Sequence, residues 1–140
     1  MNSQSKKEDI NWKALTEEQW RARLTPEQFE VLRNKGTERA FSSESCRKFD
    51  PGDYSCAGCG QLLFRSQGKF DSGTGWPSFT APVGGESVRE IEDSSCGMSR
   101  TEVICSRCDG HLGHVFDDGP PPNHKRYCIN ALSLKFAPTP

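Results

Sequence analysis

Seven cysteines carry most of the chemistry that this sequence of 140 residues offers, and four of them form two C-x-x-C pairs. The pairs are Cys56 with Cys59 and Cys105 with Cys108. A spacer of two residues lets both sulfurs of a pair reach one tetrahedral ion, and two such pairs complete a four-thiolate site. The sequence therefore predicts one structural Zn²⁺, held by turns of two different hairpins because 45 residues separate the pairs. The alternative is a redox-active C-x-x-C, but neither pair precedes a convincing helix whose N-terminus would lower the thiol pKa.

Of the three remaining cysteines, Cys128 has neighbours that suit a nucleophile. A lone cysteine is most often a small buried hydrophobic residue. Alternation along a strand predicted at 127–136 places Arg126 and Asn130 on the same face as Cys128. A guanidinium close to the sulfur favours the thiolate. Cys128 is therefore the candidate nucleophile.

Two histidines upstream, His111 and His114, lie in a segment expected to be a loop that returns over this strand. A nucleophilic thiol needs an acid or base within hydrogen-bond distance. Histidine is the side chain whose ordinary pKa lies nearest to neutral pH. Two alternatives stay open: the His-x-x-His pair could supply further metal ligands, or both rings could simply be packed in the loop.

The segment Gly73-Thr74-Gly75-Trp76-Pro77 has an unusual composition for a small domain. Its glycines and proline allow the Trp76 indole to stand on a defined loop, although a core tryptophan is the plain alternative. A thiol, an imidazole acid and an aromatic wall together suit a small, soft, apolar group such as S-methyl.

Composition narrows the class of protein. The formal net charge is −1, from 18 basic and 19 acidic residues, which argues against a nucleic-acid partner. No apolar run approaches the ~18 residues that a membrane span needs. The N-terminus shows no secretory signal, so we expect a cytoplasmic protein whose thiols stay reduced. We also expect a monomer.

The elements expected around these residues are two short helices followed by a small, mainly β domain. Thr16 with Gln19 and Thr25 with Gln28 have capping-box spacing, and the second helix is placed at about 25–35. From residue 37 the chain consists of short apolar runs broken by Gly, Pro, Asp and Ser, which indicates antiparallel strands. Strands are expected at 54–55, 62–64, 87–92, 101–104 and 127–136. We predict a disordered N-terminus at 1–12, a single domain at 13–137 and a tail at 138–140.

Several motifs in a fixed order make the chain resemble methionine sulfoxide reductase type B over residues 14–137. They are the paired C-x-x-C turns, GWPSF, RTEV, HLGHVF followed by DDGP, and RYCIN. The resemblance implies two antiparallel β-sheets in a β-tent-like arrangement with short N-terminal helices. It also implies methionine-R-sulfoxide, mainly protein-bound, as substrate and thioredoxin as the reductant.

The resemblance also implies roles for individual residues. Cys128 in RYCIN would be the nucleophile, and His114 would donate to the sulfoxide oxygen with the help of His111 and Asn130. Trp76 would hold the methyl group, and Phe116 and Arg126 would contact the substrate. The zinc ligands of the family match Cys56, Cys59, Cys105 and Cys108.

One position departs from the family pattern: many members carry a second, resolving cysteine where this chain has Thr74. We expect Cys46 to resolve the sulfenic acid formed on Cys128, because it lies in a polar segment that looks mobile. Cys96 and direct reduction by an external thiol are the alternatives. A non-enzymatic zinc-binding interaction module and a dithiol oxidoreductase that uses its C-x-x-C pairs are the competing functions.

Overall fold

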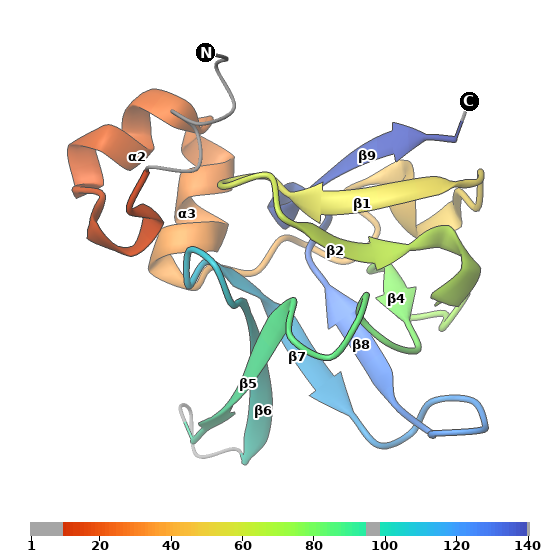
Figure 1. Ribbon diagram of the computed structural model, residues 1–140. Helices are drawn as coiled ribbons and strands as arrows, with labels where there is room; N and C mark the ends of the chain where they lie inside the picture. Colours follow the sequence, from red (N-terminus) through yellow and green to blue (C-terminus); the bar gives the residue numbers. More distant parts are fainter. Residues whose placement is uncertain (1–9, 95–98, 140) are drawn as a thin grey trace.

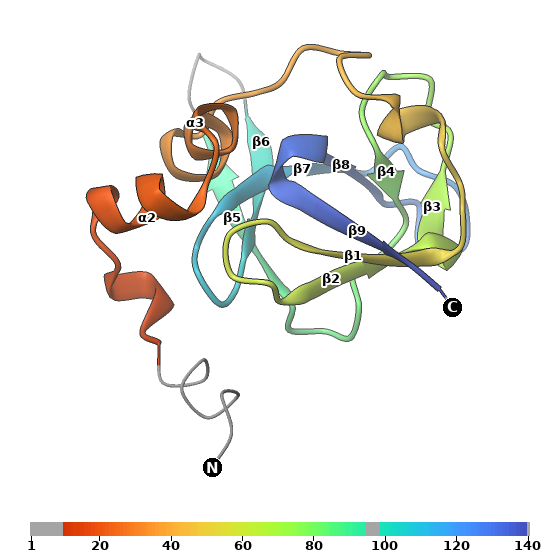
Figure 2. The ribbon, with the colours of Figure 1, turned by 90° about the horizontal axis from the view of Figure 1, so that it is seen from above.

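The computed structural model describes residues 10–94 and 99–139, apart from the side chains of residues 46 and 47. In this part of the chain the strands form two antiparallel sheets, and two short helices pack at one end of the molecule (Figure 1). The view from above shows the helices at the end opposite β3 and β4 (Figure 2). The predicted mainly β fold with two sheets and short N-terminal helices is confirmed.

Both helices begin at the predicted caps. Helix α2 covers Glu17–Arg23 and helix α3 covers Pro26–Asn34. Thr16 and Thr25 each accept a hydrogen bond from the backbone N–H three residues on, and the glutamine at that position bonds back to the cap. These reciprocal bonds satisfy backbone donors that the first turn leaves open. The second helix ends at Lys35, which has a left-handed backbone with φ of 58°.

The strands divide into a smaller and a larger sheet. The smaller sheet has the order β2-β1-β9 and the larger the order β3-β4-β8-β7-β6-β5. Strands of the smaller sheet are β1 (Gly52–Cys56), β2 (Leu62–Arg65) and β9 (Leu134–Pro138). Strands of the larger sheet are β3 (Lys69–Phe70), β4 (Ser78–Phe79), β5 (Val88–Asp93), β6 (Arg100–Cys105), β7 (His111–Phe116) and β8 (Arg126–Ile129). Short 3₁₀ helices are η1 (Trp12–Ala14), η2 (Glu44–Arg47), η3 (Ser66–Gly68) and η5 (Ala131–Ser133).

The long strand predicted at 127–136 is wrong as a single element. It consists of β8 in the larger sheet and β9 in the smaller, and η5 makes the crossing between them. Asn130 therefore follows the strand that carries Cys128 instead of continuing it. Apolar alternation continues through the crossing although β8 buries alternate residues and β9 is mostly exposed, so the pattern does not mark the break.

The segment predicted as a histidine loop is in fact strand β7, at the centre of the larger sheet between β6 and β8. Its pairing with β6 shifts between Gly113, opposite Val103, and His111, opposite Ile104. Leu112 is the extra residue of this β-bulge. A bulge interrupts the alternation of side chains, which is why HLGHVF does not follow the two-residue period of a regular strand.

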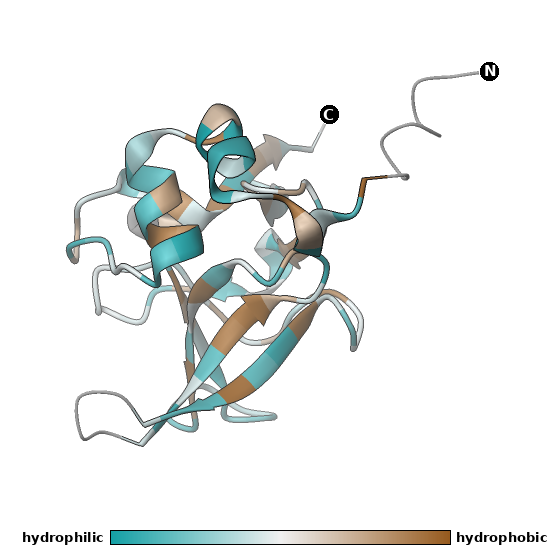
Figure 3. Ribbon diagram, turned by 90° about the vertical axis from the view of Figure 1, so that its left-hand side faces the viewer, coloured by the Kyte–Doolittle hydropathy of each residue, from teal (hydrophilic) through white to brown (hydrophobic). Residues whose placement is uncertain are grey.

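The core lies between the two sheets and continues under the helices. Phe64 and Phe79 are fully buried and stacked, with ring centroids 4.4 Å apart, and Tyr54 meets Phe79 edge-on. The β5–β6 hairpin carries both hydrophobic and hydrophilic residues (Figure 3): β6 is buried from Glu102 to Cys105, whereas most of β5 is exposed.

Residues on both sides of the proposed domain limits of 13–137 contact the rest of the described chain. Trp12 is only 7% exposed, and its ring lies 6.1 Å from that of Trp20. Residue 12 is thus part of the fold, while residues 1–9 of the predicted disordered N-terminus lie outside the described residues. At the other end Pro138 still pairs in β9, and the Thr139 N–H bonds to the Pro51 carbonyl. None of the helices in the described residues is long and apolar enough to cross a membrane.

Candidate active site and metal centre

The four paired cysteines converge on one point. Their sulfurs all lie within 4.8 Å of one another, and all four residues are buried. Cys56 and Cys108 are 3.7 Å apart at Sγ, and Cys59 and Cys105 are 3.5 Å apart. A tetrahedral zinc with bonds of about 2.3 Å needs sulfurs about 3.8 Å apart, so the donor set and its spacing fit this ion.

Each C-x-x-C pair forms the turn of a hairpin, as predicted. The first pair closes the β1–β2 hairpin and the second closes the β6–β7 hairpin. In both turns the residue after the second cysteine has positive φ, 84° at Gly60 and 64° at Asp109. In both turns its N–H bonds to the carbonyl of the first cysteine. The two turns have the same backbone design and come from different sheets.

The N-terminal helices cover the cysteine cluster. Arg33 donates from Nη1 to the carbonyl of Cys108 at 2.9 Å. The ring of Trp20 lies so close to Gly58 that a Cβ there would be 3.1 Å from it. The hydrogen bond from the Cys105 thiol foremost, and that from Cys108, lower the pKa of Cys56, a direction that suits a metal-binding thiolate.

Replacing Cys56 or Cys105 by serine should release zinc and destabilise the chain severely. A structural zinc site contributes on the order of 10 kcal/mol, comparable to the net stability of a whole domain. Zinc content by atomic absorption and thermal unfolding by circular dichroism measure both effects. Cys128→Ser is the matched control and should keep the ion. An unchanged melting temperature in the metal-free variants would contradict a structural role.

A pocket of about 260 Å³ lies beside the candidate nucleophile. Cys128 is on β8 between two partners: it pairs with Ser78 of β4 on one side and with His114 of β7 on the other. Its side chain is partly exposed. The described residues that line the pocket are Thr37, Thr74, Trp76, Arg100, Gly113, His114, Phe116, Arg126, Cys128 and Asn130.

The surroundings of the Cys128 sulfur act on its pKa in opposite directions. Burial raises the pKa above the ordinary value, and the Glu38 charge adds to this rise. A hydrogen bond with the Thr74 side chain and the charge and hydrogen bond of Arg126 lower it, but burial dominates. The expected effect of Arg126 is present, yet it does not outweigh burial, and the pKa of Cys128 is raised overall.

His114 lines the pocket, and a buried carboxylate holds its ring. Nε2 is 2.9 Å from Oδ2 of Asp93, a carboxylate that is only 5% exposed. Arg100, which also lines the pocket, lies 3.6 Å from the same carboxylate oxygen. The acid at the end of β5 therefore fixes the orientation of the imidazole.

His111 occupies a different position from the one expected of an assistant to the acid. It is 2% exposed, its Nδ1 lies 2.7 Å from Oε2 of Glu102, and burial lowers its pKa. It is not among the described residues that line the pocket. The bulge at Leu112 nevertheless brings its ring to 5.5 Å from that of His114, so His111 supports that ring from the interior. Neither histidine is among the residues of the metal cluster.

Glu38 connects two predicted site residues. Its carbonyl accepts from the Trp76 indole at 2.9 Å, and its N–H donates to Oδ1 of Asn130 at 3.0 Å. The Asn130 amide also donates to the Leu112 carbonyl at 3.1 Å. The side-chain oxygen and nitrogen of Asn130 both hydrogen-bond to backbone groups, so this residue holds two segments of the pocket wall together.

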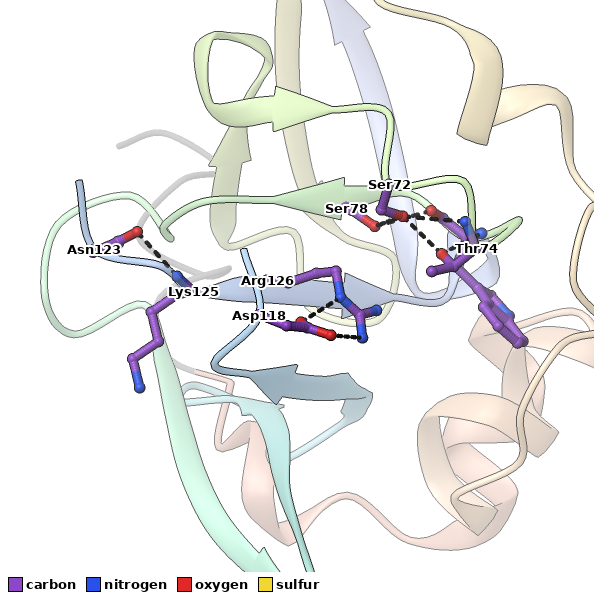
Figure 4. Close-up of polar contacts among 8 residues, drawn as sticks. Ser72, Thr74, Ser78, Asp118, Asn123, Lys125 and Arg126 are labelled. Carbon is purple, nitrogen blue, oxygen red and sulfur yellow. Dashed lines mark hydrogen bonds and ion pairs between the residues drawn. The ribbon is translucent and has the colours of Figure 1, made fainter. Parts of the chain in front are cut away.

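Phe116 and Arg126 were predicted to contact the substrate, and both line the pocket. The guanidinium lies 4.4 Å from the centre of the Phe116 ring. It also binds Asp118 with two hydrogen bonds, 2.8 Å from Nε and 3.1 Å from Nη2 (Figure 4). These two hydrogen bonds fix the orientation of the guanidinium beside the pocket, and the Asp118 carboxylate offsets part of its charge.

The two candidate resolving cysteines are described only in part. Cys96 lies outside the described residues, and so does the side chain of Cys46, whose backbone belongs to η2. The ammonium of Lys69 donates to the carbonyls of Ser45 and Lys48. The segment that looked mobile is therefore tied to β3 on both sides of Cys46.

Sequence reasoning missed the acids Asp93 and Glu102, the hub Glu38 and the close approach at Gly113. A Cβ on Gly113 would lie 2.0 Å from the Cys128 carbonyl oxygen, so only glycine fits. RTEV, which contains Glu102, was noted only as part of a resemblance. The partners of these residues are distant in sequence, and no local pattern points to them.

Two comparisons with known proteins cover most of the chain. The profile of the SelR domain family matches residues 24–138. The "Peptide methionine sulfoxide reductase MsrB" of Thiobacillus denitrificans is 58% identical over 123 residues, covering 88% of this chain and 93% of that protein. The protein of the same name from Methanosarcina barkeri is 58% identical over 86% of this chain and 85% of its own length. That from Pseudomonas paraeruginosa is 59% identical over 85% of this chain and 90% of its own length.

Proposed function

The chain belongs to the methionine sulfoxide reductase B family, and we propose that it reduces methionine-R-sulfoxide to methionine with Cys128 as the nucleophile. The activity itself, that of a peptide-methionine (R)-S-oxide reductase, follows from this membership. The residue roles and the recycling route below are our proposal. Family membership also favours the enzyme over a non-enzymatic zinc-binding module and over a dithiol oxidoreductase.

The observation that carries the proposal is the position of the Cys128 sulfur. It lies on the wall of a pocket that also presents an indole, Trp76, and an imidazole, His114. The indole suits the methyl group of the substrate and the sulfur suits attack on the sulfoxide. Cross-strand pairing sets His114 directly beside the nucleophile, on the side where the sulfoxide oxygen would lie. Phe116 and Arg126 extend the contact with the substrate.

The reaction balances with Cys128 starting as the thiol. Its sulfur attacks the sulfoxide sulfur while His114 protonates the oxygen. The oxygen then passes to Cys128: the S–O bond of the substrate and the transient bond between the two sulfurs break, a sulfenic acid forms on Cys128, and methionine leaves. The sulfoxide sulfur gains two electrons and Cys128 loses two; the oxygen keeps the proton from His114, and the thiol proton replaces it on His114. A protonated imidazole donates from both nitrogens, so His114 can serve the oxygen while it keeps Asp93.

A single-turnover experiment tests the function. Incubated without reductant, the chain should convert about one equivalent of the R epimer of N-acetyl-methionine sulfoxide and none of the S epimer, because Cys128 reacts once and is not regenerated; two thiols should be lost if Cys46 then forms the disulfide. Chromatography measures the methionine formed, and thiol titration measures the loss. Cys128→Ser should form none while it keeps fold and zinc. Turnover of the S epimer, or by the serine variant, would contradict the proposal.

His114→Ala should slow the chemical step by about 100-fold, as expected for loss of a general acid. Rapid-mixing measurement of methionine formation under single-turnover conditions isolates that step. His124→Ala is the matched control, because His124 lies in an exposed loop outside the pocket and should react at the original rate. A His114 variant within twofold of the original would overturn its assignment as the acid.

For the return to the thiol we propose that Cys46 attacks the sulfenic acid on Cys128, expels water and leaves a disulfide. The bonds from Lys69 to the carbonyls on either side of Cys46 must open for this step. An external dithiol, which we expect to be thioredoxin, then reduces the disulfide. A cytoplasmic location, a preference for protein-bound substrate and a monomeric state belong to the same proposal.

Peptide mapping after one equivalent of substrate should recover a Cys46–Cys128 disulfide. In Cys46→Ser, Cys128 should instead remain a sulfenic acid that dimedone traps, since the internal thiol is gone. Cys96→Ser is the matched control and should still give the disulfide. A bridge to Cys96, or a sulfenic acid that persists in the unmodified chain, would refute the role of Cys46.

A further inference from the structure

The pocket around Cys128 extends in both directions along the strands, and Trp76 lies at one end. Trp76 precedes Ser78, the β4 partner of Cys128, by two residues. Because β4 and β8 are antiparallel, this places Trp76 beside the end of β8 that leads to Asn130. The bonds of Glu38 agree with this placement, since its carbonyl accepts from the Trp76 indole and its N–H donates to the Asn130 side chain.

Side chains from three neighbouring strands form the other end of the pocket. Arg126 lies two residues before Cys128 on β8 and pairs with Phe116 of β7. The register of β6 against β7 brings Arg100 level with Phe116. Arg126, Phe116 and Arg100 all line the pocket. Cys128 therefore lies between an indole at one end and two guanidinium groups at the other.

The chain itself binds these two guanidinium groups to different extents. Arg126 donates to the Asp118 carboxylate from Nε at 2.8 Å and from Nη2 at 3.1 Å (Figure 4). The contact of Arg100 is longer, 3.6 Å from Nη2 to Oδ2 of Asp93, and the same oxygen lies 2.9 Å from His114 Nε2. Within residues 10–94 and 99–139, the buried Nε of Arg100 has no hydrogen-bond partner.

Arg100 therefore has N–H groups that it can donate to a ligand. An arginine carries five N–H donors and no acceptor, and a donor that is left without an acceptor is costly once water is excluded. With Nε buried and the side chain 28% exposed, the Nη groups are the donors that a molecule in the pocket can reach. This end of the pocket thus suits an oxygen acceptor, above all a charged one.

The proposed substrate has an oxygen acceptor on the side of the sulfur that this arrangement requires. In methionine sulfoxide a methyl group lies on one side of the sulfur, and two methylene groups lead to Cα on the other. With the methyl group against Trp76 and the sulfur beside Cys128, the methylene groups extend toward the guanidinium end. Beyond Cα comes the main-chain carbonyl oxygen of a peptide, or the α-carboxylate of the free amino acid.

We propose that Arg100 is a substrate-binding residue that donates to this carbonyl or carboxylate oxygen of the sulfoxide residue. The inference rests on the proposed function, because it takes the sulfoxide sulfur to lie at Cys128 and the methyl group at Trp76. Arg100 makes the site prefer a sulfoxide that has a carbonyl carbon on Cα over one that lacks it. An ionised carboxylate is bound more tightly than a neutral amide, because its hydrogen bonds are charge-assisted.

Three substrates that differ only at this carbon test the proposal on the unmodified, zinc-loaded chain. They are the R epimers of N-acetyl-methionine sulfoxide, of its N-methyl amide, and of N-acetyl-3-(methylsulfinyl)propylamine, which lacks the carboxyl group. Rapid mixing without reductant, over a range of concentrations, gives an apparent dissociation constant and a maximal rate of sulfide formation for each. The amide should bind about fivefold and the propylamine about 30-fold more weakly than the carboxylate, with equal maximal rates.

Arg100→Met removes the donors and keeps a long side chain. The variant should bind the carboxylate about 30-fold and the amide about fivefold more weakly than the original chain, and should bind the propylamine equally well. Arg100→Lys keeps one charged donor group and should restore most of the affinity for the carboxylate. Arg89→Met is the matched control, because Arg89 is exposed on β5, contacts Asp109 and is not among the described residues that line the pocket.

Two results would overturn the role of Arg100 in binding. The first is a maximal rate that falls in Arg100→Met with all three substrates, which would mean that Arg100 acts through Asp93 on His114. The second is an original chain that binds the three substrates equally well, and this result needs no variant to fold. Failure of the original chain to convert any of the three sulfoxides would instead contradict the proposed function, so the two failures are distinguishable.

Discussion

The position of β8 between β4 and β7 is the constraint on which the site depends. Pairing on both sides sets Ser78 of β4 and His114 of β7 opposite Cys128, which fixes the place of Cys128 beside the imidazole. The approach of β7 is close enough that Gly113 has no room for a side chain. A pocket built on paired strands keeps its geometry better than one built on loops, and here Cys128 and His114, the proposed nucleophile and acid, are paired on neighbouring strands.

Burial and charge act against each other at this nucleophile. Burial raises the pKa of Cys128, while Thr74 and Arg126 lower it. Enclosure also serves the substrate, because an S-methyl group prefers an apolar wall. The thiol needs no lasting charge: sulfoxide reduction consumes a thiol and returns a sulfenic acid with the same number of protons.

Local patterns in the sequence predicted local features well. The caps at Thr16 and Thr25 and the two metal-binding turns depend on residues within four positions, and all were placed correctly. The break between β8 and β9 and the bulge in β7 depend on pairing between distant strands, which alternation does not report. The partners of the histidines, Asp93 and Glu102, come from β5 and β6 for the same reason. The sequence therefore showed which residues carry chemistry, but not what orients them.

The metal centre and the catalytic pocket are joined through one hairpin. The turn at Cys105 and Cys108 connects β6 to β7, and His111 follows Cys108 after two residues. Fixing this turn against the β1–β2 turn fixes where β7 begins, and hence where the bulge at Leu112 falls. A slip of one residue would turn the imidazole of His114 away from Cys128, because side chains alternate along a strand. A metal ion held by the four cysteines would thus join the two sheets and also fix the register that sets His114 beside Cys128.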